Sequence, residues 1–208
     1  MSLIQYTSVV FIFFISLNIS SQNENNIKRI GGPCEGCEAI YEYGNKRLAS
    51  VDTLPQFNKL PNPIKVKGVV YKDDGKTPAS DIILYVYHTN NKGVYPSGKN
   101  SKGWERRHGY LRGWMKTDSQ GRYAFYTSRP ASYPNSSIPQ HIHITVKEPD
   151  KNEYYIDDFY FKDDPNITNT ILNKRNSRAG FGVLSLKKEE MLQVATRDIV
   201  LGLNIPNY

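Results

Sequence analysis

The sequence predicts an all-β protein built as an antiparallel β-sandwich. From about residue 60 onward, short runs rich in Val, Ile, Tyr and Phe alternate with turn signals such as Asp73-Asp74-Gly75 and Asp118-Ser119-Gln120-Gly121. This region shows little of the 3.6-residue apolar period of a helix, and strands at this spacing are typical of a sandwich. With 208 residues, of which 38% are hydrophobic, the chain is long enough for one domain with a substantial core.

Six runs of residues are predicted as strands. Each combines β-branched or aromatic residues with partial alternation of apolar and polar side chains. The predicted strands cover residues 64–71, 82–88, 123–127, 142–146, 154–161 and 194–201. The polar, Asn-rich stretch 163–180 is predicted to be a long loop, and the sequence shows no internal repeat.

An apolar run at residues 9–15 is predicted to belong to a signal peptide, residues 1–21. The run is too short to span a bilayer and is followed by mostly small or polar residues. No Lys or Arg precedes it, so an uncleaved N-terminal anchor is the alternative. We therefore expect a secreted or periplasmic protein without a membrane span after cleavage, with an N-terminal segment at 22–60 and the sandwich domain at 61–208.

The two cysteines, Cys34 and Cys37, lie in this N-terminal segment. In an oxidising compartment a C-x-x-C pair most simply closes a small disulfide loop. A thioredoxin-like redox role would need a βαβ context that the flanking residues do not supply, and a zinc site would need a second pair. We therefore predict a local disulfide.

Basic residues outnumber acidic ones, and the formal net charge is +7. The excess is concentrated in one loop, where a single acid, Glu105, accompanies six basic residues. These are Lys92, Lys99, Lys102, Arg106, Arg107 and Arg112. No basic helix or nucleic-acid recognition motif accompanies the charge, so we expect no nucleic-acid partner. The loop is either a solvated surface or a region that steers anionic substrates.

Two histidines at positions i and i+2, His141 and His143, are the clearest sign of a chemical site. On a strand their side chains share one face, while Ile142 points to the other. Such a pair can form half of a metal site, although core or exposed histidines would show the same pattern. Tyr133, a short loop earlier, and Tyr95 favour the metal interpretation.

Seven segments of the chain form a characteristic series of motifs. They are Gly68-Val69-Val70, Asp73-Asp74-Gly75-Lys76-Thr77-Pro78, Val86-Tyr87-His88 with Gly93-Val94-Tyr95, Leu111-Arg112-Gly113, Thr117-Asp118 with Gly121-Arg122-Tyr123, Pro130 to Tyr133-Pro134, and His141-Ile142-His143. In order and spacing this series resembles the intradiol ring-cleavage dioxygenases. The resemblance runs from about residue 60 onward. It implies the β-sandwich of that family, with long loops around the active site.

The resemblance implies one non-haem Fe(III) with Tyr95, Tyr133, His141 and His143 as its ligands. Two phenolates would offset two of the three charges of this hard ion. The implied reaction inserts both atoms of O2 into a catechol-type diol and cleaves the ring between the hydroxyl-bearing carbons, giving a cis,cis-muconate-type product. Tyr133 is implied to leave the metal when substrate binds and to take up a substrate proton, while Tyr95 stays bound.

One position departs from the pattern of the family. Many members carry an arginine three residues before the first histidine, where it is thought to stabilise the electron-rich substrate ring, and this chain has Ile138 there. Arg112 is the favoured catalytic substitute because it belongs to the matching Leu-Arg-Gly segment, and Arg129 is the second candidate. Arg112 could equally be a structural arginine that supports the loop carrying Tyr95.

The remaining histidines and the tryptophans are given lesser roles. His88 is predicted to pack beside the site. His108 lies in a polar stretch predicted to be a loop and is predicted to be exposed to solvent, with a substrate contact as the alternative. Trp104 and Trp114 flank the basic loop, where they serve either ordinary packing or as an aromatic wall for a planar ring.

Two functions from other classes compete with the dioxygenase. The first is a secreted β-sandwich binding module without turnover, for which Ile138 is the best argument. The second is an iron or zinc enzyme that uses His141 and His143 with one carboxylate. A ferric phenolate site would be coloured, whereas a site with two histidines and a carboxylate would be colourless or pale.

Overall fold

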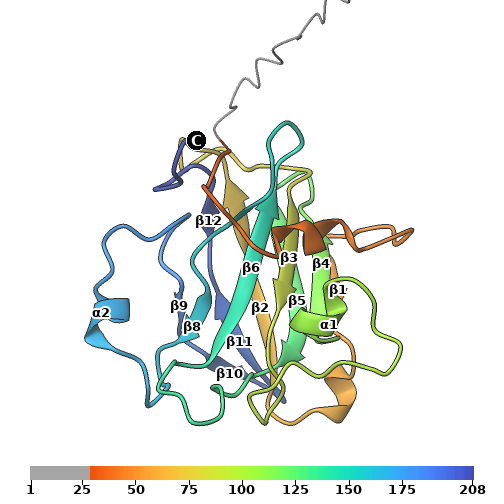
Figure 1. Cartoon of the computed structure of the whole chain (residues 1–208). Helices are drawn as coiled ribbons and strands as arrows, with labels where there is room; N and C mark the ends of the chain where they lie inside the picture. The colour runs from red at the N-terminus through yellow and green to blue at the C-terminus, as the bar shows by residue number, and fades with distance from the viewer. Residues whose placement is uncertain (1–28) are drawn as a thin grey trace, which may run out of the picture.

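Two six-stranded sheets pack face to face to form the protein (Figure 1). The structure is a computed structural model that describes residues 29–208, so the predicted signal peptide lies outside the described residues. No helix within residues 29–208 is long and apolar enough to cross a membrane.

The first sheet has the order β1-β5-β2-β11-β10, with β12 paired to β2. Its strands are β1 (Val51–Thr53), β2 (Pro63–Tyr71), β5 (Arg122–Ser128), β10 (Lys187–Glu189), β11 (Leu192–Thr196) and β12 (Ile199–Val200). The second sheet has the order β4-β3-β6-β8-β9, with β7 paired to β6. Its strands are β3 (Ile83–Tyr87), β4 (Arg112–Lys116), β6 (His141–Lys147), β7 (Tyr154–Tyr155), β8 (Phe159–Phe161) and β9 (Val183–Leu184).

The central pairings of both sheets are antiparallel, as the sequence predicts. They are β2 with β5, β3 with β4, and β6 with β3, β7 and β8. Four pairings are parallel: β1 with β5, β11 and β12 with β2, and β8 with β9. Side-chain alternation fixes which face of a strand is buried and not the direction of its neighbour, so the sequence pattern could not reveal these parallel pairs.

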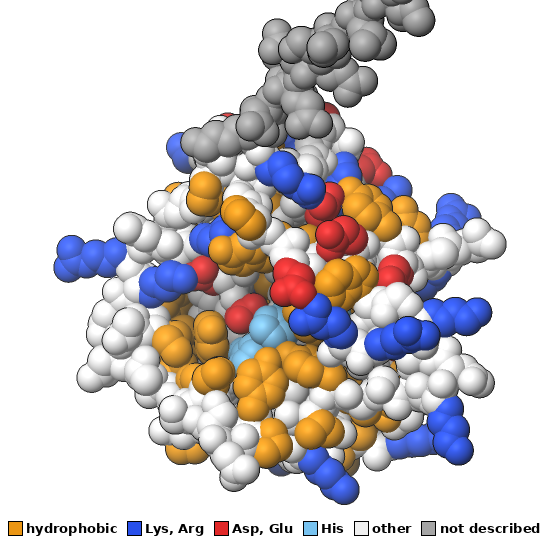
Figure 2. Space-filling view, in the orientation of Figure 1, with side chains coloured by type: hydrophobic (Ala, Val, Ile, Leu, Met, Phe, Trp, Pro, Cys, Tyr) orange, Lys and Arg blue, Asp and Glu red, His pale blue; other side chains and the backbone are white. Residues whose placement is uncertain are grey.

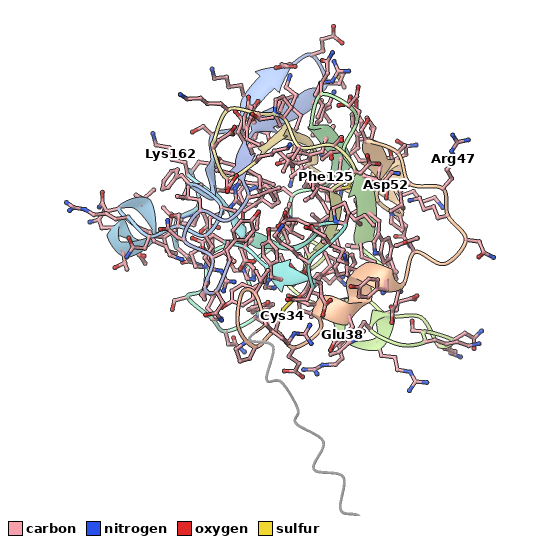
Figure 3. All side chains as sticks on the ribbon, turned by 90° about the horizontal axis from the view of Figure 1, so that it is seen from above. Cys34, Glu38, Arg47, Asp52, Phe125 and Lys162 are labelled. Atoms are coloured by element: carbon pink, nitrogen blue, oxygen red, sulfur yellow. A yellow bond between two sulfur atoms is a disulfide. The ribbon has the colours of Figure 1, made fainter. Side chains whose placement is uncertain are left out.

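The hydrophobic core fills the space between the sheets. Strand β6 illustrates how the sequence builds it, because Ile142, Ile144 and Val146 are at most 1% exposed and belong to the main core cluster. Phe125 of β5 reaches the same cluster from the opposite sheet and lies in the interior in Figure 3. Alternation in β6 then sends His141 and His143 to the outer face of the second sheet.

This outer face is covered by the N-terminal segment. A 3-10 helix, η1 (Cys37–Tyr41), contributes Ala39 and Ile40 to a second cluster with Tyr85 and Trp114. The predicted disulfide is present and joins Cys34 to Cys37, the first residue of this helix. The loops carry three further short helices, η2 (Phe57–Lys59), α1 (Glu105–His108) and α2 (Asn169–Leu172). The N-terminal segment thus forms a wall over the face that holds the two histidines.

Four of the six predicted strands are confirmed with ends that shift by at most one residue, as β2, β3, β5 and β6. The predicted strand 154–161 is divided into β7 and β8, and the predicted strand 194–201 is divided into β11 and β12. Strands β1, β4, β9 and β10 were not predicted, and the loop at 163–180 contains the single turn α2. These short or charged strands have too few apolar positions to show a two-residue period.

Candidate functional site

Two long loops carry the tyrosines to the end of β6. Tyr95 lies between β3 and α1, and Tyr133 lies between β5 and β6. The loops are joined side by side, because the Ala131 N–H donates to the Asn90 carbonyl at 3.1 Å and the Thr89 hydroxyl donates to the Ala131 carbonyl at 2.6 Å. This connection holds Tyr95 and Tyr133 at the same place on the outer face of the second sheet.

The structure brings all four predicted ligands together. The Tyr95 hydroxyl lies 2.5 Å from the Tyr133 hydroxyl and 2.8 Å from His143 Nε2. The Tyr133 hydroxyl lies 3.2 Å from His141 Nε2 and 3.3 Å from His143 Nε2, and the two Nε2 atoms are 3.2 Å apart. Ligands bound about 2.0–2.1 Å from one metal ion lie about 3 Å from their neighbours, so this spacing fits a common metal.

The outward nitrogen of each imidazole has its own acceptor. The Nδ1 atom of His141 lies 2.7 Å from the Pro139 carbonyl, and Nδ1 of His143 lies 3.1 Å from the Asp158 carboxylate. Both contacts favour the tautomer with the proton on Nδ1, which leaves the two Nε2 lone pairs facing each other. Both Nε2 atoms can then act as metal ligands beside the two phenol oxygens, so the donor set fits a metal ion.

The two phenols also need a cation before they can ionise. Burial, followed by the hydrogen bond with Tyr133, raises the pKa of Tyr95, and burial raises the pKa of Tyr133. Both groups are therefore protonated at neutral pH in the metal-free protein. A bound cation of high charge would reverse this by stabilising the phenolates.

Asp158 is the carboxylate nearest to the two histidines, and the sequence analysis did not single it out. With His141 and His143 it forms a group whose candidate ligand atoms lie within 4.8 Å of one another. Its carboxylate, however, contacts Nδ1 of His143, while the tyrosines contact Nε2. Burial opposes ionisation of Asp158, but the interaction with His143 outweighs it and keeps the pKa of the carboxyl below its usual value. Asp158 therefore orients His143 instead of sharing a metal with Nε2, and this disfavours a site with two histidines and a carboxylate.

A cavity of about 260 Å³ opens beside the four side chains, and Tyr95, Tyr133 and His143 line one side of it. The rest of its lining is Glu35, Tyr87, Trp104, Arg107 and His108. Figure 2 shows pale-blue histidine side chains in a hollow, with acidic and basic side chains beside them. The cavity can therefore hold a small planar ligand against the donor cluster.

Arg112 and Arg129 do not line this cavity. The Arg112 guanidinium donates to Glu42 and to Glu105 and lies over the Trp114 ring, 5.1 Å from its centroid. This position agrees with the alternative interpretation of Arg112 as a structural arginine. The Arg129 guanidinium is bound to Asp163, at 2.8 and 2.9 Å, and to Gln140.

The prediction for His108 was wrong, because its side chain is buried. His108 is 6% exposed, accepts or donates a 2.9 Å hydrogen bond with the Tyr85 hydroxyl, and stacks on Tyr87 with ring centroids 3.8 Å apart. Burial lowers the pKa of His108 to about 4, so the ring is neutral at neutral pH. Tyr87 in turn stacks on His143, the residue opposite it in the β3–β6 register. An aromatic column therefore supports the candidate ligand His143.

The other minor predictions agree with the structure. His88 is fully buried and bonded to the Thr89 carbonyl at 2.7 Å and to the Thr127 hydroxyl at 2.6 Å, as expected of a packing residue. Trp114 packs in the second cluster, whereas Trp104 lines the cavity. Ile138 is 47% exposed and lines neither this cavity nor a second one of about 300 Å³ that is also lined by Tyr87.

Several solved structures share the fold. The dioxygenase domain of a dioxygenase carbohydrate-binding protein fusion from Streptomyces sp. SirexAA-E matches with a TM-score of 0.54 and 21% identity, over 77% of this chain and 94% of that chain. Chlorocatechol 1,2-dioxygenase from Pseudomonas putida matches with a TM-score of 0.53 and 18% identity, over 77% of this chain and 68% of that chain. Hydroxyquinol 1,2-dioxygenase from Pseudomonas putida DLL-E4 matches with a TM-score of 0.52 and 20% identity, over 74% of this chain and 60% of that chain.

Sequence comparison gives the family. No curated protein matches the chain. A protein-family model described as Dioxygenase matches residues 42–200, which is well over half of the chain and includes all four converging side chains. The structural matches confirm the predicted sandwich and include catechol 1,2-dioxygenases. The chain therefore belongs to the intradiol ring-cleavage dioxygenase family.

Proposed function

We propose that the protein is an Fe(III)-dependent dioxygenase that inserts both atoms of O2 into a catechol-type diol, with cleavage between the two hydroxyl-bearing carbons. The product would be of the cis,cis-muconate type. One observation carries the proposal, namely the convergence of the Tyr95 and Tyr133 hydroxyls on Nε2 of His143. Two anionic oxygens and two neutral nitrogens suit a hard ferric ion better than a zinc ion.

Bound ferric iron would supply the positive charge that ionises the phenols and draws both oxygens of a catechol to one centre. Tyr95, Tyr133, His141 and His143 would hold the ion. Burial of the two phenols makes their ionised forms depend on that ion, because desolvation raises the pKa of each. The aromatic walls of the cavity, including Tyr87 and Trp104, would orient a planar ring and keep water from it.

Tyr133 is the residue we assign to proton transfer. Tyr133 lines the cavity, and the contacts of its hydroxyl to His141 and His143, at 3.2 and 3.3 Å, are longer than the 2.8 Å contact of Tyr95 to His143. A phenolate at this position would accept a proton from a substrate hydroxyl when the substrate takes its place. Tyr95 would remain a ligand throughout the reaction.

We also propose that the protein is exported to an oxidising compartment. The Cys34–Cys37 disulfide supports export, because such bonds persist outside the cytoplasm. The apolar run 9–15 supports it as well. Fractionation of producing cells tests this proposal, since export predicts a protein outside the cytoplasm that lacks the first 21 residues.

An absorption spectrum combined with iron analysis tests the proposed function. The purified protein is expected to hold one iron per chain and to show a broad visible charge-transfer band. Anaerobic catechol should move the band to longer wavelength, and admission of O2 should consume one O2 per ring cleaved. A protein that stays colourless after ferric loading would exclude the tyrosine ligands. A coloured protein that binds catechol without turnover would support the binding module instead.

A further inference from the structure

A charged pair lines the same cavity as Tyr95, Tyr133 and His143. Nη1 of Arg107 donates to the Glu35 carboxylate, and both residues line the cavity. The Arg107 guanidinium also lies over the Trp104 ring, 5.4 Å from its centroid. The two residues come from distant parts of the sequence, Glu35 from the disulfide loop and Arg107 from α1.

The fold fixes the backbone of both partners. Glu35 lies between Cys34 and Cys37, whose disulfide closes the loop around it. The next residue, Gly36, has φ 84° and approaches α1 so closely that a Cβ there would lie 2.8 Å from Nε2 of His108. His108 is itself held by its stack on Tyr87. The loop with Glu35 and the helix with Arg107 are therefore in direct contact, and this contact places the two charged residues next to each other.

Glu35 and Arg107 are the only permanently charged side chains in the described lining of the cavity. The buried imidazole of His108 is neutral at neutral pH, as shown above. A guanidinium has five N–H donors, and the contact with Glu35 uses one of them. Both side chains are more than half exposed, at 63% for Arg107 and 72% for Glu35, so a ligand can reach either one.

We propose that Arg107 is the recognition residue for an anionic substituent on the substrate ring, and that Glu35 competes with that substituent for the guanidinium. This inference rests on the proposed function, because it assumes that the ring binds at the donor cluster. A carboxylate already sits on Arg107 in the structure, which shows that the guanidinium can hold such a group beside the cavity. A ring carboxylate would replace Glu35 there, whereas a neutral ring would leave the pair intact.

A set of four proteins tests the proposal: wild type, Glu35→Gln, Arg107→Gln and the double variant. Each is loaded with iron, and the dissociation constants of catechol and 3,4-dihydroxybenzoate are measured without oxygen from the visible band. The quantity compared is the affinity for the carboxylated ring divided by the affinity for catechol. Glu35→Gln should raise this ratio about 3- to 5-fold, and Arg107→Gln should lower it by a similar factor. The affinity ratio of the double variant should lie between the ratios of the two single variants.

Matched controls separate local recognition from net charge. Glu38→Gln and Lys102→Gln change the charge by the same amounts at exposed positions that do not line the cavity. They should leave the ratio unchanged, and the effects at Glu35 and Arg107 should shrink as salt is added. All four positions are exposed, so the variants should keep the unfolding midpoint of the wild type, which is checked by urea titration.

The outcomes distinguish this inference from the proposed function. If both rings bind to the wild type and the ratio moves no more in Glu35→Gln and Arg107→Gln than in the controls, the recognition role is overturned while the dioxygenase proposal stands. If neither ring binds to the iron-loaded wild type, the proposed function fails and the inference fails with it. A rise with Glu35→Gln together with a fall with Arg107→Gln supports the proposal.

Discussion

Gly93 packs directly against the backbone carbonyl of Ser132, so closely that a Cβ at position 93 would lie 2.0 Å from that oxygen. Its backbone also has φ 74°, in the left-handed region that favours glycine. This contact joins the loop that carries Tyr95 to the loop that carries Tyr133. The spacing of the two phenol oxygens thus depends on the absence of a side chain two residues before Tyr95.

Gly93→Ala should therefore weaken both folding and metal binding. The clash with Ser132 and the unfavourable φ predict a loss of at least about 2 kcal/mol in the free energy of unfolding. Iron content after loading should fall because the loops must move apart. Gly98→Ala is the matched control, since its nearest atom, Ser101 Oγ, would be 3.7 Å from the new Cβ. Equal iron content in Gly93→Ala and Gly98→Ala would contradict the argument.

The four candidate ligands should respond differently to substitution. His141→Ala and His143→Ala should each lose iron, because each removes a nitrogen from the cluster. Tyr133→Phe should keep most of its iron but lose turnover by about 100-fold or more, because it lacks the proton acceptor. Iron per chain and kcat for catechol are measured for each protein. If both histidine variants hold as much iron as the wild type, His141 and His143 are not ligands.

Asp158→Asn should weaken iron binding without removing a ligand. The amide is similar in size to the carboxylate but lacks its negative charge, so His143 would be held in its tautomer less firmly. An increase of about 10- to 100-fold in the iron dissociation constant is expected, measured by competition with a chelator. Asp163→Asn serves as the control, because Asp163 is an exposed carboxylate bound to Arg129. If both variants bind iron equally, Asp158 has no positioning role.

The metal-free protein should lose stability in mild acid through His88. Burial lowers the pKa of His88 from 6.5 to about 4 in the folded state. Between these pH values the imidazole binds a proton more readily in the unfolded chain than in the folded one. The contribution of His88 to the free energy of unfolding is therefore complete above pH 6.5 and is lost as pH falls toward 4. The full loss is roughly 3 kcal/mol. Urea unfolding at pH 7, 5 and 4 measures it, and His88→Gln should show a shallower pH dependence; an identical slope would assign the loss to other groups.

Local sequence pattern predicted the parts of the site that depend on a single strand. The shared face of His141 and His143 follows from the two-residue period of β6, and the structure agrees. The same period identified the apolar face that forms the core. The proximity of Tyr95 and Tyr133 came from the family resemblance, because the two loops meet only through tertiary contacts such as that of Thr89 with Ala131.

Residues whose roles depend on distant contacts could not be predicted in this way. His108 belongs to a polar stretch of sequence, and its burial depends on Tyr87 and on the N-terminal segment that packs over it. Asp158 is one acid among several in its region, and only the fold shows that it contacts His143. Glu35 belongs to a segment more than 70 residues before the loop that it contacts, so no local pattern connects it with Arg107.

The start of the described chain is held by residues that follow all the strands. The Gly31 N–H donates to the Pro206 carbonyl at 2.7 Å, and the Asn207 side chain donates to the Arg29 carbonyl at 3.0 Å. The segment that leads into the disulfide loop is therefore anchored by residues that come more than 170 positions later in the chain. Although Glu35 is synthesised long before the histidines, the segment that leads to it gains this anchor only after residue 207 has been synthesised, so the anchor forms after all the described strands have been made.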